Sequence, residues 1–266
     1  MRALAIEATM SRQNTLAEQF RALHVRGNPL LLFNIWDPGS ARAVAAAGAK
    51  ALALGSWSVA AANGYADGER IPLDFAVGNL RRIVAAVDLP VSIDLESGYG
   101  EKPDDVAATV ARAIKAGAIG CNLEDSFPQD GRLREPADNV RRLARARAAA
   151  EATGVAFFIN ARTDDFMQAP AENHNLALLR SALERGRAYA DAGADGLFIP
   201  GLVDPALIER AARESALPLN IMKSASAPSL RRLGELGVAR VSHGPGPYRA
   251  MMKHLEDAAR EALIAG

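Results

Sequence analysis

The sequence is poor in several features that mark particular classes of protein. Cys121 is the only cysteine, so no intrachain disulfide can form, and a reducing, cytoplasmic setting is favoured. Basic and acidic residues number 31 each, which leaves no basic surplus for nucleic acid or a membrane surface. No stretch approaches the roughly 20 apolar residues of a membrane span, and Met1–Arg21 lacks the apolar core of a signal peptide. We therefore expect a cytoplasmic protein without nucleic-acid or membrane partners.

Short apolar runs recur along the chain, and a longer helical pattern follows each of them. Gly or Pro flanks these runs, and continuous apolar runs of this kind are typical of parallel strands buried on both faces. They predict eight strands: Leu30–Ile35, Ala51–Ser56, Pro90–Glu96, Ala118–Asp125, Val155–Arg162, Gly196–Gly201, Pro218–Met222 and Arg240–His243.

A weak internal repeat supports this pattern. Glycines 48, 117, 193 and 237 each stand between the end of an expected helix and the next strand. The turn there requires glycine, because the C-terminus of the helix adopts a positive φ. The expected helices are Ser40–Ala47, Pro103–Ala116, Leu176–Ala192, Asp204–Ala212 and Ser226–Leu236, the last two with Asp204 and Ser226 as N-caps.

Eight such units in about 250 residues predict a (β/α)₈ TIM barrel. We expect one domain over residues 1–266, with an extra helix within Met1–Gly27 and a closing helix over Tyr248–Ala265. A doubly wound open sheet is the alternative, but the first turn, Trp36–Ser40, is not a Gly-rich phosphate loop.

Three acidic residues stand at the expected ends of neighbouring strands, where the chemistry of a TIM barrel takes place. Asp94 and Glu96 are two apart on strand three and should point the same way, and Glu124 ends strand four. Oxygen ligands without nearby His or Cys favour Mg²⁺ as the cofactor, with Mn²⁺ as a further option. The alternative is that these acids cap helices or pair with arginine.

Arg162 ends strand five, where its guanidinium can bind a substrate carboxylate or phosphonate through two parallel hydrogen bonds. Its alternative role is an internal ion pair with Glu124 or Asp164. At the end of strand two, Ser56 and nearby backbone N–H groups can bind a second carboxylate, and Gly55 would permit close approach of the backbone.

The segment Asp94–Gly100, Asp-Leu-Glu-Ser-Gly-Tyr-Gly, resembles the Asp-x-Asp-x-Gly-Tyr-Gly segment of the isocitrate lyase/phosphoenolpyruvate mutase superfamily. Gly55-Ser56, Leu123-Glu124-Asp125 and Ala161–Asp164 follow in the order of that family. The resemblance covers about Leu30 to Tyr248.

The resemblance implies a TIM barrel whose last helix is exchanged between paired subunits, and hence a homodimer or homotetramer. It also implies Mg²⁺ held by Asp94, directly or through water together with Glu96 and Glu124. The substrate would be a small carboxylate, with negative charge developing on its C2 oxygen. The residues implied to contact this substrate are Ser56, Trp57, Arg162 and, from the loop Tyr65–Gly68, Asp67.

The sequence departs from the family pattern in two places. Glu96 stands where the family usually has Asp, which moves the carboxylate outward by one methylene. The loop Glu124–Leu133 lacks the Lys-Lys/Arg-Cys-Gly-His segment of isocitrate and methylisocitrate lyases and the Lys-Thr-Asn segment of the mutases, and only Phe127-Pro128 is similar to the mutase loop. We expect Cys121 to be a core residue within strand four.

These departures favour members of the family that decarboxylate oxaloacetate. That reaction requires stabilisation of an enolate but no acid for the departing group, because CO₂ leaves unaided and solvent can protonate the enolate. Decarboxylase-like members also resemble this chain in a His near the end of strand eight, where His243 stands. His243 and Asn220 are therefore candidate substrate contacts, and the alternative for His243 is a packing or capping role.

The sequence thus supports a Mg²⁺-dependent enzyme that cleaves a carbon–carbon bond in a small 2-oxo or 2-hydroxy acid, oxaloacetate decarboxylase-like or methylisocitrate lyase-like. Carbon–phosphorus chemistry of the phosphoenolpyruvate mutase or phosphonopyruvate hydrolase type is the second hypothesis. A non-catalytic barrel that binds a metabolite is the third, although intact clustered acids argue against it.

Overall fold

The computed structural model describes the backbone of residues 2–264 and the side chains of residues 11–264. Met1 and Ala265, at the ends of the two expected terminal helices, lie outside the described residues. Eight parallel strands form one sheet in the order β1-β8-β7-β6-β5-β4-β3-β2. Their bounds are β1 Leu30–Leu32, β2 Leu52–Ala53, β3 Val91–Asp94, β4 Gly120–Glu124, β5 Phe158–Arg162, β6 Gly196–Phe198, β7 Leu219–Met222 and β8 Arg240–Ser242.

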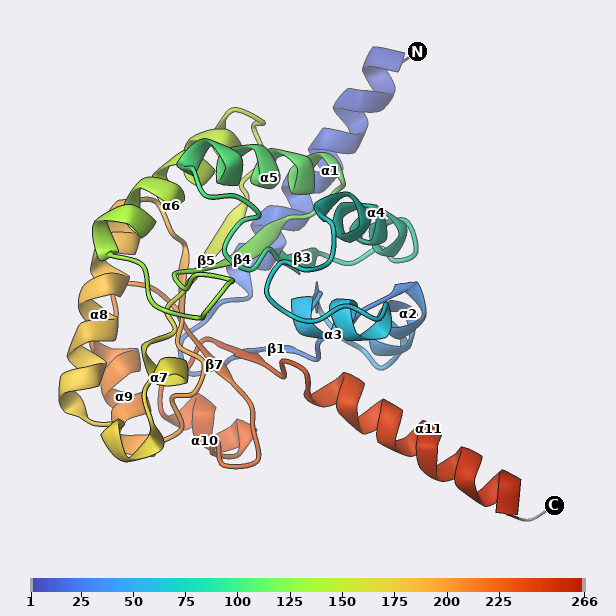
Figure 1. Cartoon of the computed structure of the whole chain (residues 1–266). Coiled ribbons are helices and arrows are strands. Elements are labelled where there is room, and N and C mark those ends of the chain that lie inside the picture. Colours follow the sequence, from blue (N-terminus) through green and yellow to red (C-terminus); the bar gives the residue numbers. More distant parts are fainter. Residues whose placement is uncertain (1, 265–266) are drawn as a thin grey trace.

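The sheet closes between its two edge strands just beyond their ends. Ile35 and Leu54 form an isolated parallel bridge. The N–H of Ile35 donates to the carbonyl of Ala53 over 2.9 Å, and the N–H of Gly55 donates to the carbonyl of Ile35 over 3.1 Å. This closure, with helices around the strands (Figure 1), confirms the predicted (β/α)₈ barrel.

Each strand is followed by at least one helix, and two units carry extra ones. The second unit contains both α3 and α4, and the fifth contains α7 and a 3₁₀ turn before α8. The bounds are α1 Arg2–Ala22, α2 Pro38–Ala46, α3 Ser56–Ala62, α4 Leu73–Val84, α5 Pro103–Lys115, α6 Pro136–Glu151, α7 Asp165–Gln168, η1 Ala171–Asn173, α8 Leu176–Asp191, α9 Pro205–Glu214, α10 Leu230–Glu235 and α11 Gly246–Ile264.

The turns that join helices to strands follow the predicted rule. The φ angles of glycines 48, 117, 193 and 237 lie between 88° and 102°. Asp204 caps α9 as expected by accepting a hydrogen bond from Leu207 N. The start of α10 was predicted wrongly, because Ser229 and not Ser226 is the N-cap. Pro228 disfavours a helical conformation for the residue before it, so the helix begins only after the proline.

Helix α1 closes the N-terminal end of the barrel, which confirms the extra helix expected there. The side chain of Phe20 is fully buried, and its ring lies 5.5 Å from that of Phe158, at the start of β5. His24 stacks on Phe158 with ring centroids 4.1 Å apart. Burial lowers the pKa of His24 to about 3, so this ring is neutral. The functional site is therefore expected at the opposite end of the strands.

Helix α11 does not cover the barrel. It projects away from the other helices (Figure 1), and Pro247 is its one buried residue among those described up to Ile264. Met251 and Leu255 are 47% and 60% exposed, respectively. Over residues 2–264, no helix combines the length and the apolar character that crossing a membrane requires.

Candidate active site

Asp94 is the last residue of β3, and its side chain is the centre of the candidate site. Its Oδ2 accepts a hydrogen bond from Ser56 Oγ over 2.8 Å, and its Oδ1 accepts one from the N–H of Glu96 over 3.3 Å. Ser56 is the first residue of α3 and follows the short strand β2. The closed barrel thus brings two strand ends together around one carboxylate.

Glu96 lies beside Asp94, but not for the reason expected. β3 ends at Asp94, and Glu96 adopts a left-handed conformation with φ of 51°, so strand alternation does not orient it. Its carboxylate accepts from the N–H of Glu69 over 2.6 Å and from Tyr99 Oη over 3.3 Å. Burial, followed by the charges of Asp94 and Asp67, raises the pKa of Glu96 to about 8.

Glu124 and Arg162 form an ion pair at the ends of β4 and β5. Arg162 Nη1 lies 2.8 Å from Glu124 Oε2, and its Nε and Nη2 donate to the two oxygens of Asp164. Burial raises the pKa of Glu124 well above its ordinary value, although Arg162 opposes the shift. Burial would by itself lower the pKa of Arg162, but Glu124 and Asp164 raise it overall. Two of the five guanidinium N–H groups donate to Asp164, and Nη1 pairs with Glu124, so the guanidinium retains N–H groups that a substrate could use.

Two loops meet over the mouth of the barrel. A Cβ added at Gly68, which has φ of 87°, would lie 2.8 Å from the carbonyl oxygen of Pro128, so the loop that carries Asp67 touches the loop after β4. Asp67 is exposed at this position. Desolvation and the negative charge of Asp94 raise its pKa, while Arg162 opposes the shift. The loop that carries Asp67 thus lies within reach of the charges of Asp94 and Arg162.

The fit of this site to a metal ion differs from the expectation of three converging acids. Across the described side chains, no three His, Cys, Asp or Glu residues form a ready-made metal cluster. Arg162 holds Glu124, and the N–H of Glu69 holds Glu96, so the free oxygens of the three acids do not meet at one point. Asp94 flanked by these two carboxylates fits hydrated Mg²⁺, because Mg²⁺ retains several waters and binds through one or two carboxylates.

The residues expected at the end of β2 take different positions. Ser56 reaches Asp94, as described above. Gly55 has φ of −101°, and an added Cβ would make only ordinary contacts, the nearest at 3.6 Å, so the structure does not require glycine there. The Trp57 ring contacts Tyr248 and Arg249 at the start of α11.

Asn220 lies below the site, in a buried layer of amides. Its Oδ1 accepts from Asn160 Nδ2 over 3.1 Å, and its Nδ2 donates to Ser242 Oγ over 3.3 Å. Asn160 also donates to Asn122 Oδ1, and Arg240 Nη2 donates to the same oxygen. Because both polar atoms of Asn220 have partners within the barrel, the structure places it as an internal support and not beside the carboxylates.

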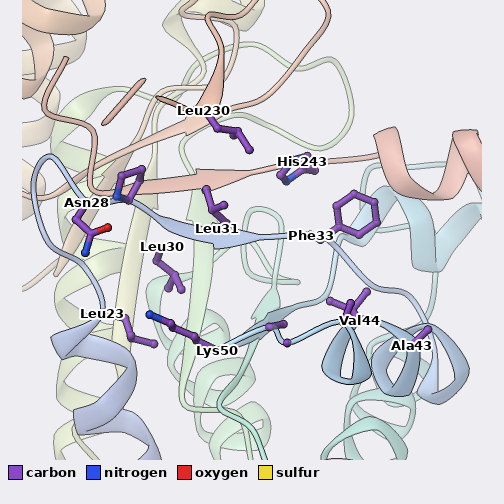
Figure 2. Close-up of a pocket in the computed structure, with 14 residues that line it drawn as sticks. Leu23, Asn28, Leu30, Leu31, Phe33, Ala43, Val44, Lys50, Leu230 and His243 are labelled. Atoms are coloured by element: carbon purple, nitrogen blue, oxygen red, sulfur yellow. The ribbon is translucent and has the colours of Figure 1, made fainter. Parts of the chain in front are cut away.

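His243 does not join the other candidate residues. Arg240 and Ser242 point into the barrel, where they bond the amide layer, so the next side chain along the strand direction points outward. The ring of His243 lies 5.1 Å from that of Phe33, and its Nδ1 is 3.1 Å from the carbonyl oxygen of Leu32. Figure 2 shows it in a groove that Leu31 and Phe33 also line, and Asp94 is not among the residues that line this groove. The predicted contact between His243 and the substrate has no support in this arrangement.

The loop after β4 contains no free acid close to the carboxylates. Ser126 Oγ donates to Asp164 Oδ2 over 2.6 Å and also lies 3.2 Å from Glu124 Oε1. Cys121 is fully buried in β4, as expected, and burial raises the pKa of its thiol. This leaves metal-assisted stabilisation of negative charge as the chemistry that the residues around Asp94 fit.

The family model described as phosphoenolpyruvate phosphomutase matches residues 20–263 of the chain. The chain belongs to this family. The match extends over the whole barrel and confirms the resemblance to the isocitrate lyase/phosphoenolpyruvate mutase superfamily read from the motifs around Asp94 and Arg162.

Relatives of this phosphomutase-family chain carry the names of two lyase activities. Oxaloacetate decarboxylase of Pseudomonas entomophila is 33% identical over 252 residues, covering 91% of this chain and 82% of the relative. 2-Methylisocitrate lyase of Salmonella typhimurium is 31% identical over 250 residues, covering 90% and 82%, respectively.

Solved structures of the family superpose closely on this chain. A Burkholderia cenocepacia protein, provisionally named a phosphonomutase, is 56% identical with a TM-score of 0.92, over 94% of this chain and 99% of that one. A phosphonopyruvate hydrolase in complex with oxalate and Mg²⁺ is 23% identical with a TM-score of 0.81, over 94% and 88%, and this likeness shows the shared fold.

Sequence reasoning missed several residues that shape the site of this family member. The carboxylate of Glu69, which has φ of 59°, accepts from Ser97 Oγ and from the N–H of Tyr99, so it ties the Asp67 loop to the segment after β3. Its place directly after Asp67-Gly68 was the available signal. Tyr99 belongs to the recognised motif, but no sequence pattern indicated its contact with Glu96.

Proposed function

We propose that the chain is a Mg²⁺-dependent lyase that cleaves a carbon–carbon bond beside the 2-oxo group of a small carboxylic acid through an enolate. The observation that carries this proposal is the arrangement at three strand ends. Asp94 is oriented by Ser56, and Arg162, which donates two hydrogen bonds to Asp164 and pairs with Glu124, retains N–H groups for a substrate carboxylate. The oxaloacetate decarboxylase and methylisocitrate lyase names among the relatives support this reaction class.

The raised pKa values support a cation at this place. Glu96 and Glu124 both bind protons more readily than in water because burial penalises their charge. A bound cation removes that penalty. Asp94 would hold Mg²⁺ directly and Glu96 and Glu124 would hold it through water, and the bound ion supplies positive charge beside the C2 oxygen as that oxygen becomes negative.

In decarboxylation, this chain's own residues would bind and orient the substrate. The remaining N–H groups of Arg162 would hold one carboxylate, and Ser56 would keep Asp94 in place. The bond between C3 and the departing carboxylate then breaks, its electron pair forms the enolate C2–C3 double bond, and CO₂ leaves. A proton from solvent completes pyruvate at C3. With Ser126 bonded to Asp164, no acid from the loop after β4 is needed.

The direct test is pyruvate formation from oxaloacetate with Mg²⁺, corrected for the reaction caused by the metal alone. Saturable pyruvate formation in the wild type, lost in Asp94→Ala, is the expected result. Asp88→Ala is a matched control, because Asp88 is an exposed aspartate that pairs with Arg12. Turnover of none of the C3–C6 2-oxo and 2-hydroxy diacids would refute the proposal. Binding without turnover would point to the non-catalytic barrel.

Carbon–phosphorus chemistry is a second candidate, favoured by the 56% identical structure that carries the provisional name phosphonomutase. Phosphonopyruvate is the diagnostic substrate. Release of inorganic phosphate from it, or formation of phosphoenolpyruvate seen by ³¹P NMR, would favour this candidate over carbon–carbon cleavage.

We also propose that the protein is a homodimer or homotetramer in which α11 exchanges between subunits. A groove of about 790 Å³ lies outside β1, where a (β/α)₈ barrel would normally carry its last helix (Figure 2). Leu31 and Phe33 are 44% and 47% exposed in it, and α11 exposes Met251 and Leu255. Phe33→Asp should dissociate the oligomer in light scattering, whereas Met167→Asp, at a similarly exposed site, should not.

A further inference from the structure

Both tryptophans of the chain contact the same residue at the start of α11. The ring of Tyr248 lies 5.2 Å from that of Trp36, at an interplanar angle of 89°, and 6.0 Å from that of Trp57, at 74°. The guanidinium of Arg249 lies 4.4 Å from the Trp57 ring centroid. The chain has no other tryptophan. We call Trp36, Trp57 and Tyr248 the aromatic triad.

The triad joins the base of α11 to the part of the site that orients Asp94. Trp57 directly follows Ser56, whose Oγ donates to Asp94. Helix α3 has seven residues, and its N-cap Gly55 supplies no side-chain hydrogen bond, so packing has to hold the first turn. Among the described contacts of Trp57, the aromatic and cation–π partners are Tyr248 and Arg249.

The connection that precedes Tyr248 is held firmly in place. Asn34 Oδ1 accepts from the N–H groups of both His243 and Gly244 over 2.9 Å. Gly244 has φ of 52°, and an added Cβ would lie 2.6 Å from Met222 Sδ, so this bend requires glycine. Because Asn34 is itself buried just beyond the end of β1, the barrel dictates where Tyr248 packs.

We propose that Tyr248 is a positioning residue: through Trp57 it holds Ser56 against Asp94, so ligand binding at the site and the packing of the base of α11 are coupled. The nature of the ligand rests on the proposed function, but the coupling does not. Coupling between sites is reciprocal. A ligand at Asp94 therefore changes the environment of Trp57, and loss of Tyr248 weakens the binding of that ligand.

Tryptophan emission reports on this coupling directly, because both tryptophans belong to the triad. Full-length protein is titrated with Mg²⁺ alone, and then with oxalate at saturating Mg²⁺, in a Trp36→Phe background that leaves Trp57 as the one emitter. We expect ligand to change the emission. Tyr248→Ala should shift the emission to the red and abolish most of the ligand-induced change in emission. It should also weaken oxalate binding by about 3- to 10-fold, the range given by loss of aromatic pairs. Tyr248→Phe should restore both.

With a substrate that the enzyme turns over, Tyr248→Ala should raise KM by a similar factor and alter kcat less than twofold. If no substrate is turned over, the proposed reaction fails, but weaker oxalate binding in Tyr248→Ala would still support the coupling. If Tyr248→Ala leaves both the oxalate affinity and the emission response unchanged, the proposed coupling is overturned. If that variant does not fold, Arg249→Ala serves instead, and its oxalate affinity should fall about twofold. An unchanged oxalate affinity in Arg249→Ala would contradict the proposal.

A double variant separates positioning from oligomer formation. Met252→Ala with Leu255→Ala trims the exposed apolar surface of α11 and leaves Tyr248 in place. It should bind oxalate as the wild type does, even where it weakens the oligomer. If it reproduces the loss seen in Tyr248→Ala, oligomer formation and not the triad controls the site, and the inference is wrong.

Discussion

Ser56 donates a hydrogen bond to Asp94 over 2.8 Å and so links the end of β2 to the end of β3. Hydrogen bonds to charged groups contribute about 1.5–3 kcal/mol. Ser56→Ala should therefore lower kcat/KM for the substrate by about 10- to 100-fold in steady-state assays. Ser58→Ala is the matched control, since Ser58 lies two residues further along α3 and is buried. Equal losses in the two variants would contradict a specific role for Ser56.

The pKa of Glu96 predicts how the stability of the metal-free protein changes with pH. In the folded state it is raised from its ordinary 4.5 to about 8, so folding favours the protonated form. Glu96 contributes this stability fully below pH 4.5. The stability is lost progressively as pH rises above 4.5 and is gone once pH has risen through 8. The free energy of unfolding of the wild type, relative to Glu96→Gln, should fall by up to about 1.4 kcal/mol per pH unit in between.

Urea denaturation across pH 4.5–8 measures this difference, and the Glu96→Gln variant removes contributions common to both proteins. Saturating Mg²⁺ should reduce the loss, because a cation stabilises the charged carboxylate. A difference between the two proteins that does not depend on pH would show that Glu96 titrates normally.

Arg162 sits between two acids whose charges it compensates. Removing one partner of a buried ion pair leaves an uncompensated charge, which costs about 3–5 kcal/mol. Arg162→Met should lower the free energy of unfolding by about that amount, because Glu124 and Asp164 lose their counter-ion. Arg232→Ala removes an exposed ion pair with Glu235 and should cost less than about 1 kcal/mol. Chemical denaturation of both variants provides the comparison.

The approach of the two mouth loops depends on Gly68. Gly68→Ala adds a Cβ at 2.8 Å from Pro128 O and should push the Asp67 loop away. Gly64 is a matched control, since its φ of 77° makes alanine similarly strained, about 1–2 kcal/mol, but nothing lies within 4 Å of the added Cβ. Gly68→Ala should lower kcat/KM at least fivefold more than Gly64→Ala, and equal effects would show that the loop contact does not matter.

Part of the site could be predicted from local pattern and part could not. Ser56, Asp94, Glu124 and Arg162 were expected together because residues at the carboxyl ends of parallel strands meet at one end of a barrel. The pairing of Arg162 with both Glu124 and Asp164 was only one of two open alternatives. Sequence spacing cannot show which oxygens a five-donor guanidinium reaches once the strands are side by side.

His243 and Glu96 show the limits of extending a strand pattern past its end. His243 follows two inward residues of β8, so alternation turns it to the outer groove, while resemblance alone had suggested the site. Glu96 lies beyond β3 in a left-handed conformation, and its contact with Glu69 depends on a loop 27 residues earlier in the chain. Neither outcome follows from residue type.

The sequence by itself determined the barrel, because buried strands, helices and glycine turns each follow from local spacing and backbone sterics. It also determined that Asp94, Glu124 and Arg162 stand at the ends of their strands. The tertiary structure alone decided how their charges are shared, how Tyr248 packs on both tryptophans, and where α11 leaves the barrel. Those features depend on contacts between residues far apart in the chain, whose geometry exists only after the strands have closed.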